Sequence, residues 1–187
     1  MAELVPHPTS AARGLRLAAE AWRTGGVLAV VFRVEGAVGG TRIPPPAQPR
    51  IVHGLWHHTC FEVFVGRNDT RAYHEINLSP CGGWEAYGFR AYRSGGPLTD
   101  PSLAPTMRVE RGAERFTLAA ELPVAALAPA YRRSALRIGL TAVLEADDGT
   151  LAYWSLRHPP GRPDFHHADA RMLRLAGLAG ACEGGRR

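Results

Sequence analysis

Lysine is absent from this 187-residue chain, so all 22 of its basic residues are arginines, and the net charge is +5. The arginines are scattered and form only short pairs, such as Arg132 with Arg133. Nucleic-acid binding requires a basic stripe interleaved with aromatic residues. An arginine-only basic set with abundant alanine, glycine and proline is typical of GC-rich coding, and we therefore expect no nucleic-acid partner.

Cysteine is scarce, and long apolar runs are missing. An odd number of cysteines without paired spacing, at Cys60, Cys81 and Cys182, argues against a disulfide framework. The N-terminal residues lack the basic region and apolar stretch of an export signal, and no run approaches the ~18 apolar residues of a membrane-spanning helix. These absences predict three free thiols, a cytoplasmic location and no membrane partner.

Glycine and proline are plentiful, with 21 and 15 residues, and they interrupt the sequence at short intervals. Long helices have little room between these breaks, whereas several short runs have the β-branched and apolar composition of strands. Strands are predicted at residues 15–21, 27–35, 56–65, 73–78, 84–92, 106–111, 116–122, 134–145 and 151–156. Residues 15–21 also permit a short helix, and short helical segments are expected at 123–127 and toward the end of 164–175.

The pattern predicts one all-β domain over residues 1–175, because the length suits a single core and the strands are short and closely spaced. The proline-rich stretch at 43–50 cannot hold a central strand and is expected to be an irregular loop. The small and polar residues at 176–187 are expected to form a flexible tail.

Three consecutive predicted strands alternate between two faces, as successive strand residues must. The core is expected to receive the apolar sets, which are Phe61, Val63 and Val65, then Ile76 and Leu78, then Tyr87 and Phe89. The opposite face is then predicted to collect Trp56, His58, Glu62, Tyr73, Glu75, Asn77, Trp84 and Arg90. Rings beside carboxylates, an amide and a guanidinium suit a polar ligand with apolar faces, such as a sugar. A solvated sheet face with ordinary cross-strand pairs is the alternative.

A rigid loop at residues 158–167 follows the last strand and contains three histidines and one aspartate. His158 and His166 are candidates for a rim over the ligand face. The alternative is a structural loop in which Asp164 caps a following helix.

Four segments carry a resemblance to a known family: residues 55–64 (LWHHTCFEVF), 73–87 (YHEINLSPCGGWEAY), 153–159 (YWSLRHP) and 163–166 (PDFH). Together they resemble the bacterial DOMON-like domain proteins, a group similar to the family-nine carbohydrate-binding modules and to the haem-binding DOMON cytochromes. The resemblance covers most of residues 12–175. It implies an immunoglobulin-like or jelly-roll antiparallel β-sandwich that binds a sugar or haem.

Other chemistries leave weaker signals. The spacing of His57, His58, Cys60 and His74 fits none of the usual structural zinc patterns, so no metal site is predicted. Haem remains a possible cofactor, with His58, His158, His166 and Met107 as axial donors.

Motifs for a nucleophile elbow, a phosphate loop or a dinucleotide site are absent from the sequence, and no catalytic residue is predicted. We expect a non-catalytic module that binds a carbohydrate or a similar polar small molecule. Haem binding is one alternative, and an enzyme that uses Glu62 and Glu75 on a sugar is another. The oligomeric state leaves no signal in the sequence.

Overall fold

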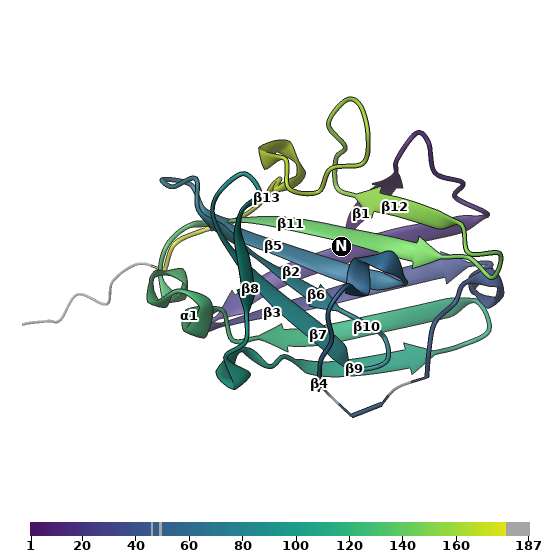
Figure 1. Ribbon diagram of the computed structural model, residues 1–187, viewed down its shortest axis with the longest axis horizontal. Helices are drawn as coiled ribbons and strands as arrows, with labels where there is room; N and C mark the ends of the chain where they lie inside the picture. The colour runs from purple at the N-terminus through teal and green to yellow at the C-terminus, as the bar shows by residue number, and fades with distance from the viewer. Residues whose placement is uncertain (46, 49, 179–187) are drawn as a thin grey trace, which may run out of the picture.

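A computed structural model describes residues 1–45, 47–48 and 50–178, and Figure 1 shows the arrangement of its strands in two layers. The described residues form thirteen strands and one four-residue α-helix, Val124–Leu127. The strands are β1 (Ala2–Pro6), β2 (Leu15–Thr24), β3 (Val27–Gly36), β4 (Arg50–Ile51), β5 (Cys60–Arg67), β6 (Tyr73–Leu78), β7 (Gly83–Ala91), β8 (Ser94–Leu98), β9 (Thr106–Arg111), β10 (Arg115–Leu122), β11 (Leu136–Glu145), β12 (Leu151–Ser155) and β13 (Leu173–Leu175). In this part of the chain no helix is long and apolar enough to cross a membrane.

Hydrogen bonding arranges the strands in the order β4-β7-β6-β5-β11-β12-β1-β2-β3-β10-β9, with β8 beside β7 and β13 beside β11. The first strand connects the two layers. Its residues up to Leu4 pair with β2, whereas Val5 and Pro6 pair with β12. One layer therefore holds β2, β3, β10 and β9, and the other holds β12, β11, β5, β6, β7 and their edge strands. All the pairs are antiparallel except the short pairing of β4 with β7.

Alternating burial places one face of each layer against the other. In β3, for example, Leu28, Val30, Phe32 and Val34 are buried and the residues between them are not fully buried. The ring of Phe32 lies 5.1 Å from the ring of Phe61 on β5, centroid to centroid, so the two layers are in direct contact. The core between the layers takes most of the apolar side chains, whose burial is the main force that holds such a sandwich together.

The predicted fold class, an all-β antiparallel sandwich, is confirmed. The predicted strands at 73–78 and 106–111 have the observed bounds, and β5, β6 and β7 are consecutive antiparallel neighbours as expected. Residues 15–21 belong to a strand rather than a helix. Four short strands were not predicted, namely β1, β4, β8 and β13, and β4 begins at the last residue of the loop expected at 43–50.

Two predicted elements are wrong. Residues 56–59 do not extend β5, because Gly54 adopts a left-handed conformation (φ 79°) and starts a 3₁₀ helix at Leu55–His57. The helix expected toward residue 175 is a 3₁₀ turn at Ala168–Ala170 followed by strand β13, which pairs with the edge of β11.

Cys60 and Cys81 are free thiols, as predicted. Cys182 and the predicted tail from residue 179 onward lie outside the described residues. Residues 176–178 belong to the expected flexible tail, yet they are hydrogen-bonded to the body of the protein. The carbonyl of Ala176 accepts from Arg23, and the amide of Leu178 donates to Arg133.

Candidate binding pocket

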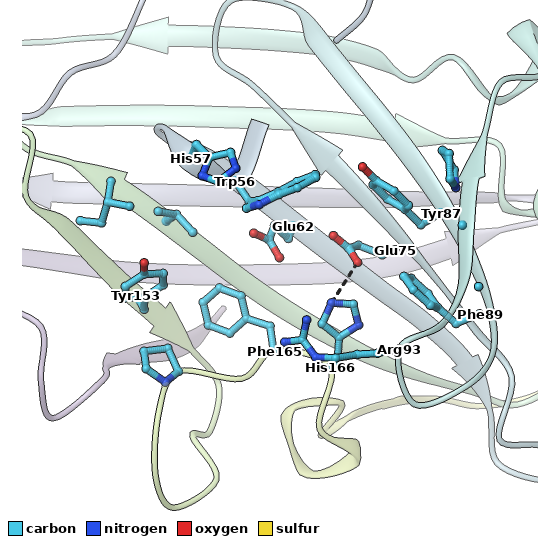
Figure 2. A pocket seen from close by; sticks show the side chains of 16 residues that line it. Trp56, His57, Glu62, Glu75, Tyr87, Phe89, Arg93, Tyr153, Phe165 and His166 are labelled. Carbon is cyan, nitrogen blue, oxygen red and sulfur yellow. Dashed lines mark ion pairs between the residues drawn. The ribbon is translucent and has the colours of Figure 1, made fainter. Parts of the chain in front are cut away.

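A cavity of about 600 Å³ lies over the face of β5, β6 and β7 that points away from the core (Figure 2). Its floor comes from β5 and β6, and its walls come from β7, β8, β12 and the segment just before β5. The loop after β12 closes one side with Pro163, Phe165 and His166. The volume falls within the ~300–1,000 Å³ of ordinary small-molecule sites.

Two carboxyl groups, from Glu62 and Glu75, point into the pocket floor (Figure 2). Glu62 pairs with Asn77 across the β5–β6 ladder, and residues two apart on a strand share a face, so Glu75 lies on the same face as Glu62. Both side chains are buried, at 4% and 5% exposure. The prediction that these three polar residues share the face opposite the core is confirmed.

Aromatic rings form much of the wall. Tyr87 and Phe89 project from β7, and the ring of Trp56 meets the ring of Tyr87 edge-on at 5.9 Å. Tyr153 of β12 and Phe165 of the closing loop stand on the other side of the floor (Figure 2). The pocket thus offers ring surfaces around a polar base.

The predicted assignment of faces in β7 is wrong. Tyr87 pairs with Glu75 and therefore faces the pocket, whereas Trp84 pairs with Leu78 and lies in the core. Aromatic residues occupy both sets of alternating positions in this strand, so the apolar set does not by itself identify the core side. Register with β6 decides it, because directly opposed residues share a face.

The prediction that Arg90 lies on the ligand face is also wrong. It is exposed and does not line the pocket, because it alternates with Phe89, which does. The arginine in the pocket wall is Arg93, at the turn from β7 to β8. Arg93 adopts a left-handed backbone conformation (φ 52°), which is uncommon for a residue with a side chain. Its guanidinium donates to Asp164 (3.1 Å) and to the hydroxyl of Tyr92 (3.3 Å).

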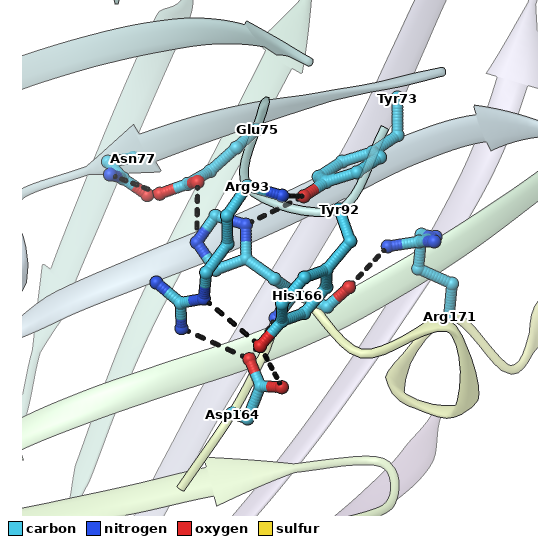
Figure 3. A network of polar contacts seen from close by, with 8 residues as sticks. All are labelled: Tyr73, Glu75, Asn77, Tyr92, Arg93, Asp164, His166 and Arg171. Carbon is cyan, nitrogen blue, oxygen red and sulfur yellow. Dashed lines mark hydrogen bonds and ion pairs between the residues drawn. The ribbon is translucent and has the colours of Figure 1, made fainter. Parts of the chain in front are cut away.

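A chain of hydrogen bonds lies beside the pocket floor, on the same face of the sheet (Figure 3). The backbone amide of Arg93 donates to the hydroxyl of Tyr73 (3.1 Å), which lies 2.9 Å from Nδ1 of His166. Nε2 of His166 faces a carboxyl oxygen of Glu75 at 3.5 Å, and the other oxygen of Glu75 accepts from the amide of Asn77 at 2.8 Å. We assign the Tyr73 proton to the bond with Nδ1, which leaves the imidazole proton on Nε2 toward Glu75.

Burial shifts the pKa values of the two glutamates and of His166 in opposite directions. Desolvation raises the pKa of Glu75 to about 7, with a further increase from the charge of Glu85, against the opposing effects of Asn77 and Arg93. The pKa of Glu62 is raised well above its ordinary value by burial and then by the charge of Glu75. Desolvation and then Arg93 lower the pKa of His166 to about 4. At neutral pH the imidazole is therefore uncharged, and the neighbouring acids keep their protons to a higher pH than exposed glutamates do.

The remaining predicted site residues have different positions. Tyr73 lies on the predicted face of the sheet, where its ring stacks on Phe89 at 4.8 Å and its hydroxyl holds His166, but it does not line the cavity itself. His58 is exposed and contacts Glu145 (2.8 Å), outside the pocket. His158 contacts the carbonyl of Val5 at 3.0 Å and does not line the pocket. Trp56 lies in the 3₁₀ turn before β5, and this turn, rather than a strand, places its ring in the pocket wall.

The loop at 158–167 contributes to the pocket as the predicted rim, through its second half. Asp164 does not cap a helix: its side chain accepts from the amide of His166 and binds Tyr92 and Arg93. The following 3₁₀ turn is capped by His167 instead. The loop is therefore connected to the β7–β8 turn by side chains that are far apart in the sequence.

Sequence alternation missed most of the pocket residues, including Tyr87, Phe89, Arg93, Tyr153 and Phe165. It also missed Glu85, which is buried on the same sheet face and accepts from His53 (2.6 Å) and from the amide of Gly54 (3.3 Å). The register of β7 would have identified Glu85, Tyr87 and Phe89 together. Among the described residues, no group of three His, Cys, Asp or Glu side chains is placed to hold a metal ion. Haem binding and a cytoplasmic location stay predictions.

No protein-family model and no curated protein matches the sequence. A candidate carbohydrate-binding protein from Bacteroides uniformis has a similar structure, with a TM-score of 0.63, 14% identity, and coverage of 91% of this chain and 84% of that protein. A family 9 carbohydrate-binding module from Caldicellulosiruptor kristjanssonii, in complex with cellotriose, matches with a TM-score of 0.51 and 11% identity, over 100% of this chain and 88% of the module. At these identities the likeness establishes the fold.

Proposed function

We propose that this protein binds a carbohydrate in the pocket over β5, β6 and β7, as a non-catalytic module. The observation that carries the proposal is the combination, in one cavity, of ring surfaces with the buried carboxyl groups of Glu62 and Glu75. A sugar ring has apolar faces that stack on aromatic rings and hydroxyls that pair with planar polar groups. The cavity volume of about 600 Å³ accommodates a small saccharide.

The structural neighbours support the same ligand class. The Caldicellulosiruptor module is in complex with cellotriose, and the Bacteroides protein is a candidate carbohydrate-binding protein. Because only the fold is shared at 11–14% identity, specificity in this protein depends on its own pocket residues.

A pair of tryptophans allows a matched test of the proposal. Trp56 lines the pocket and is 39% exposed, whereas Trp22 is similarly exposed (46%) on β2 in the other layer. Calorimetric titration with cellotriose and a panel of neutral oligosaccharides should detect binding to the native protein. Trp56→Ala should weaken that binding about tenfold through lost stacking area, and Trp22→Ala should leave it unchanged.

The polar half of the site has its own test. Glu75→Ala should weaken binding by about tenfold or more, because it removes a buried hydrogen-bonding partner of the sugar. Unchanged affinity in both Trp56→Ala and Glu75→Ala would place the ligand elsewhere. Release of reducing sugar during the titration would instead make Glu62 and Glu75 an active-site pair.

A further inference from the structure

Glu62 is a buried acid without a cationic partner. Its side chain is 4% exposed and lines the pocket, yet within the described residues no arginine or histidine forms an ion pair with it. Its cross-strand neighbour on β11, Thr141, provides a neutral hydroxyl, which favours the ionised acid but brings no positive charge. A buried polar group of this kind is costly unless a ligand satisfies it.

Of the other charged groups around the floor, Arg93 lowers the pKa of Glu62 but does not offset the effect of burial. Glu75 lies beside Glu62, and Glu85, further along the same face, is already bonded to His53 and to the amide of Gly54. The charge of Arg93 is engaged by Asp164. His166, which faces Glu75 from the closing loop, is neutral at neutral pH.

Arg171 supplies the remaining nearby positive charge, and it too is engaged. Its guanidinium lies over the ring of Tyr73 at 4.3 Å and donates to the carbonyl of His166. Two carboxyl groups therefore share one pocket floor, and Arg93 and Arg171 are held by other partners.

The aromatic walls of the pocket, like its acidic floor, favour a positively charged group on the ligand. The π faces of aromatic rings are negative and attract cations within ~6 Å of the ring centre. Tyr87 and Phe89 are stacked side by side on β7, and Trp56 stands at the rim of the same wall. Rings around a buried carboxylate pair are the chemistry with which proteins recognise an ammonium group.

We propose that the ligand of this pocket is an amino sugar, a saccharide with a free amine, whose ammonium group lies against Glu62 and Glu75. This inference rests on the proposed carbohydrate-binding function and specifies its ligand class. A neutral hydroxyl would fill a hydrogen-bonding position but would not favour the ionised form of either acid. An ammonium group balances the charge of one carboxylate and reduces the repulsion between the two acids when they ionise.

Proton release is a consequence of this arrangement. Because burial raises the pKa of Glu75 to about 7 and raises the pKa of Glu62 above its ordinary value, these acids keep their protons to a higher pH than exposed glutamates do. An amine that enters already protonated favours the ionised carboxylates, so its binding should expel protons into solution. A neutral sugar should not, and this difference is independent of how tightly either sugar binds.

Three trisaccharides with the same β-1,4 linkage test the inference: cellotriose, the trimer of glucosamine and the trimer of N-acetylglucosamine. In calorimetric titrations at pH 7, the glucosamine trimer should bind about tenfold or more tightly than the other two. Its apparent enthalpy should depend on the ionisation enthalpy of the buffer, because protons are released.

Matched variants assign the preference to Glu62. Glu62→Gln keeps the shape of the side chain and should remove the amine preference and reduce the buffer dependence. Glu121→Gln makes the same charge change at an exposed position on β10 and should preserve both effects. A urea unfolding curve for each variant confirms that it is folded.

The titrations distinguish failure of the amine inference from failure of the proposed function. Cellotriose binding as tightly as the glucosamine trimer would overturn the amine inference and leave the carbohydrate proposal intact. A full amine preference in Glu62→Gln would also overturn it. Binding of none of the three trisaccharides, nor of any neutral oligosaccharide in the panel, would overturn the proposed function and this inference together.

Discussion

At the scale of single residues, the pocket places an acid and a base in contact and shifts both toward their neutral forms. Glu75 has a pKa of about 7 and His166 a pKa of about 4, although their ordinary values lie near 4.5 and 6.5. Burial is the largest cause in each case. The contact between them at 3.5 Å is therefore a bond between two neutral groups over much of the pH range, rather than an ion pair.

These two shifts predict opposite effects of pH on stability. Glu75 holds its proton more strongly in the folded state, so its contribution becomes unfavourable as pH rises from about 4.5 to about 7. His166 holds its proton less strongly in the folded state, so its contribution becomes favourable as pH rises from about 4 to 6.5. In the natural protein the two effects oppose each other between pH 4.5 and 6.5.

Separate variants should reveal each effect. Relative to the natural protein, Glu75→Gln should gain stability as pH rises from 4.5 to 8, and His166→Gln should lose stability as pH rises from 4 to 7. The change should reach about 3 kcal/mol in each case, since one pKa unit corresponds to about 1.4 kcal/mol. Urea unfolding at pH 4.5, 6 and 8 measures it. Parallel curves for the variants and the natural protein would contradict the shifts.

At the scale of elements, the β7–β8 hairpin forms one side of the pocket and depends on a close approach of two backbones. A Cβ atom added at Gly95 would lie 1.9 Å from the carbonyl oxygen of Gly88 on β7. At the neighbouring Gly96, no atom lies within 4 Å of an added Cβ. Glycine is thus required at the first position and not at the second.

This contrast supports a prediction for two adjacent substitutions. Gly95→Ala should separate β8 from β7, speed amide hydrogen exchange in both strands and weaken ligand binding, because residues 95–97 line the pocket. Gly96→Ala should leave the exchange rates unchanged. Equal exchange rates in the two variants would show that the hairpin does not depend on this close approach.

The sequence predicts where strands form more readily than it predicts which face of each strand points to the core. In β5 one set of alternating positions up to Val65 is entirely apolar and the other contains Glu62, so the alternation assigns the core side to Phe61, Val63 and Val65. In β7 the rings occupy both sets of positions, and only the register with β6, a long-range property, places Trp84 in the core. The shortest strands, such as β13, carry too few residues for a periodic signal.

Alternation predicted the part of the pocket that comes from β5 and β6, namely Glu62 and Glu75. The predicted rim loop also contributes His166. Arg93 and Phe165 come from a turn and a loop, and the bond between Arg93 and Asp164 that brings these segments together joins residues 71 positions apart. Local patterns contain no information about such a contact.

At the scale of the whole molecule, β1 connects the two layers, and its side chains have contrasting environments. Leu4 is 1% exposed in the core, whereas the next residue, Val5, is 45% exposed. Leu4→Ala should lower the free energy of unfolding by about 2–5 kcal/mol, because it opens a cavity between the layers. Val5→Ala should change it by about 0.5 kcal/mol or less.

Chemical denaturation measures both variants with the same probe. A small loss in Leu4→Ala would mean that the layers pack well without β1. A large loss in Val5→Ala would mean that the pairing of β1 with β12 depends on the side chain as well as on the backbone.

The pairing of Val5 with Ser155 also has a consequence for synthesis on the ribosome, because these partners are about 150 positions apart. At about 5–20 residues per second, β1 leaves the ribosome roughly 8–30 s before β12 does. The hairpin of β2 and β3 can form early in that interval, but its apolar face has no opposite layer until β5 and β11 follow. During translation the nascent chain must therefore carry an exposed apolar sheet face, which makes it a candidate client for chaperones that bind unfinished chains.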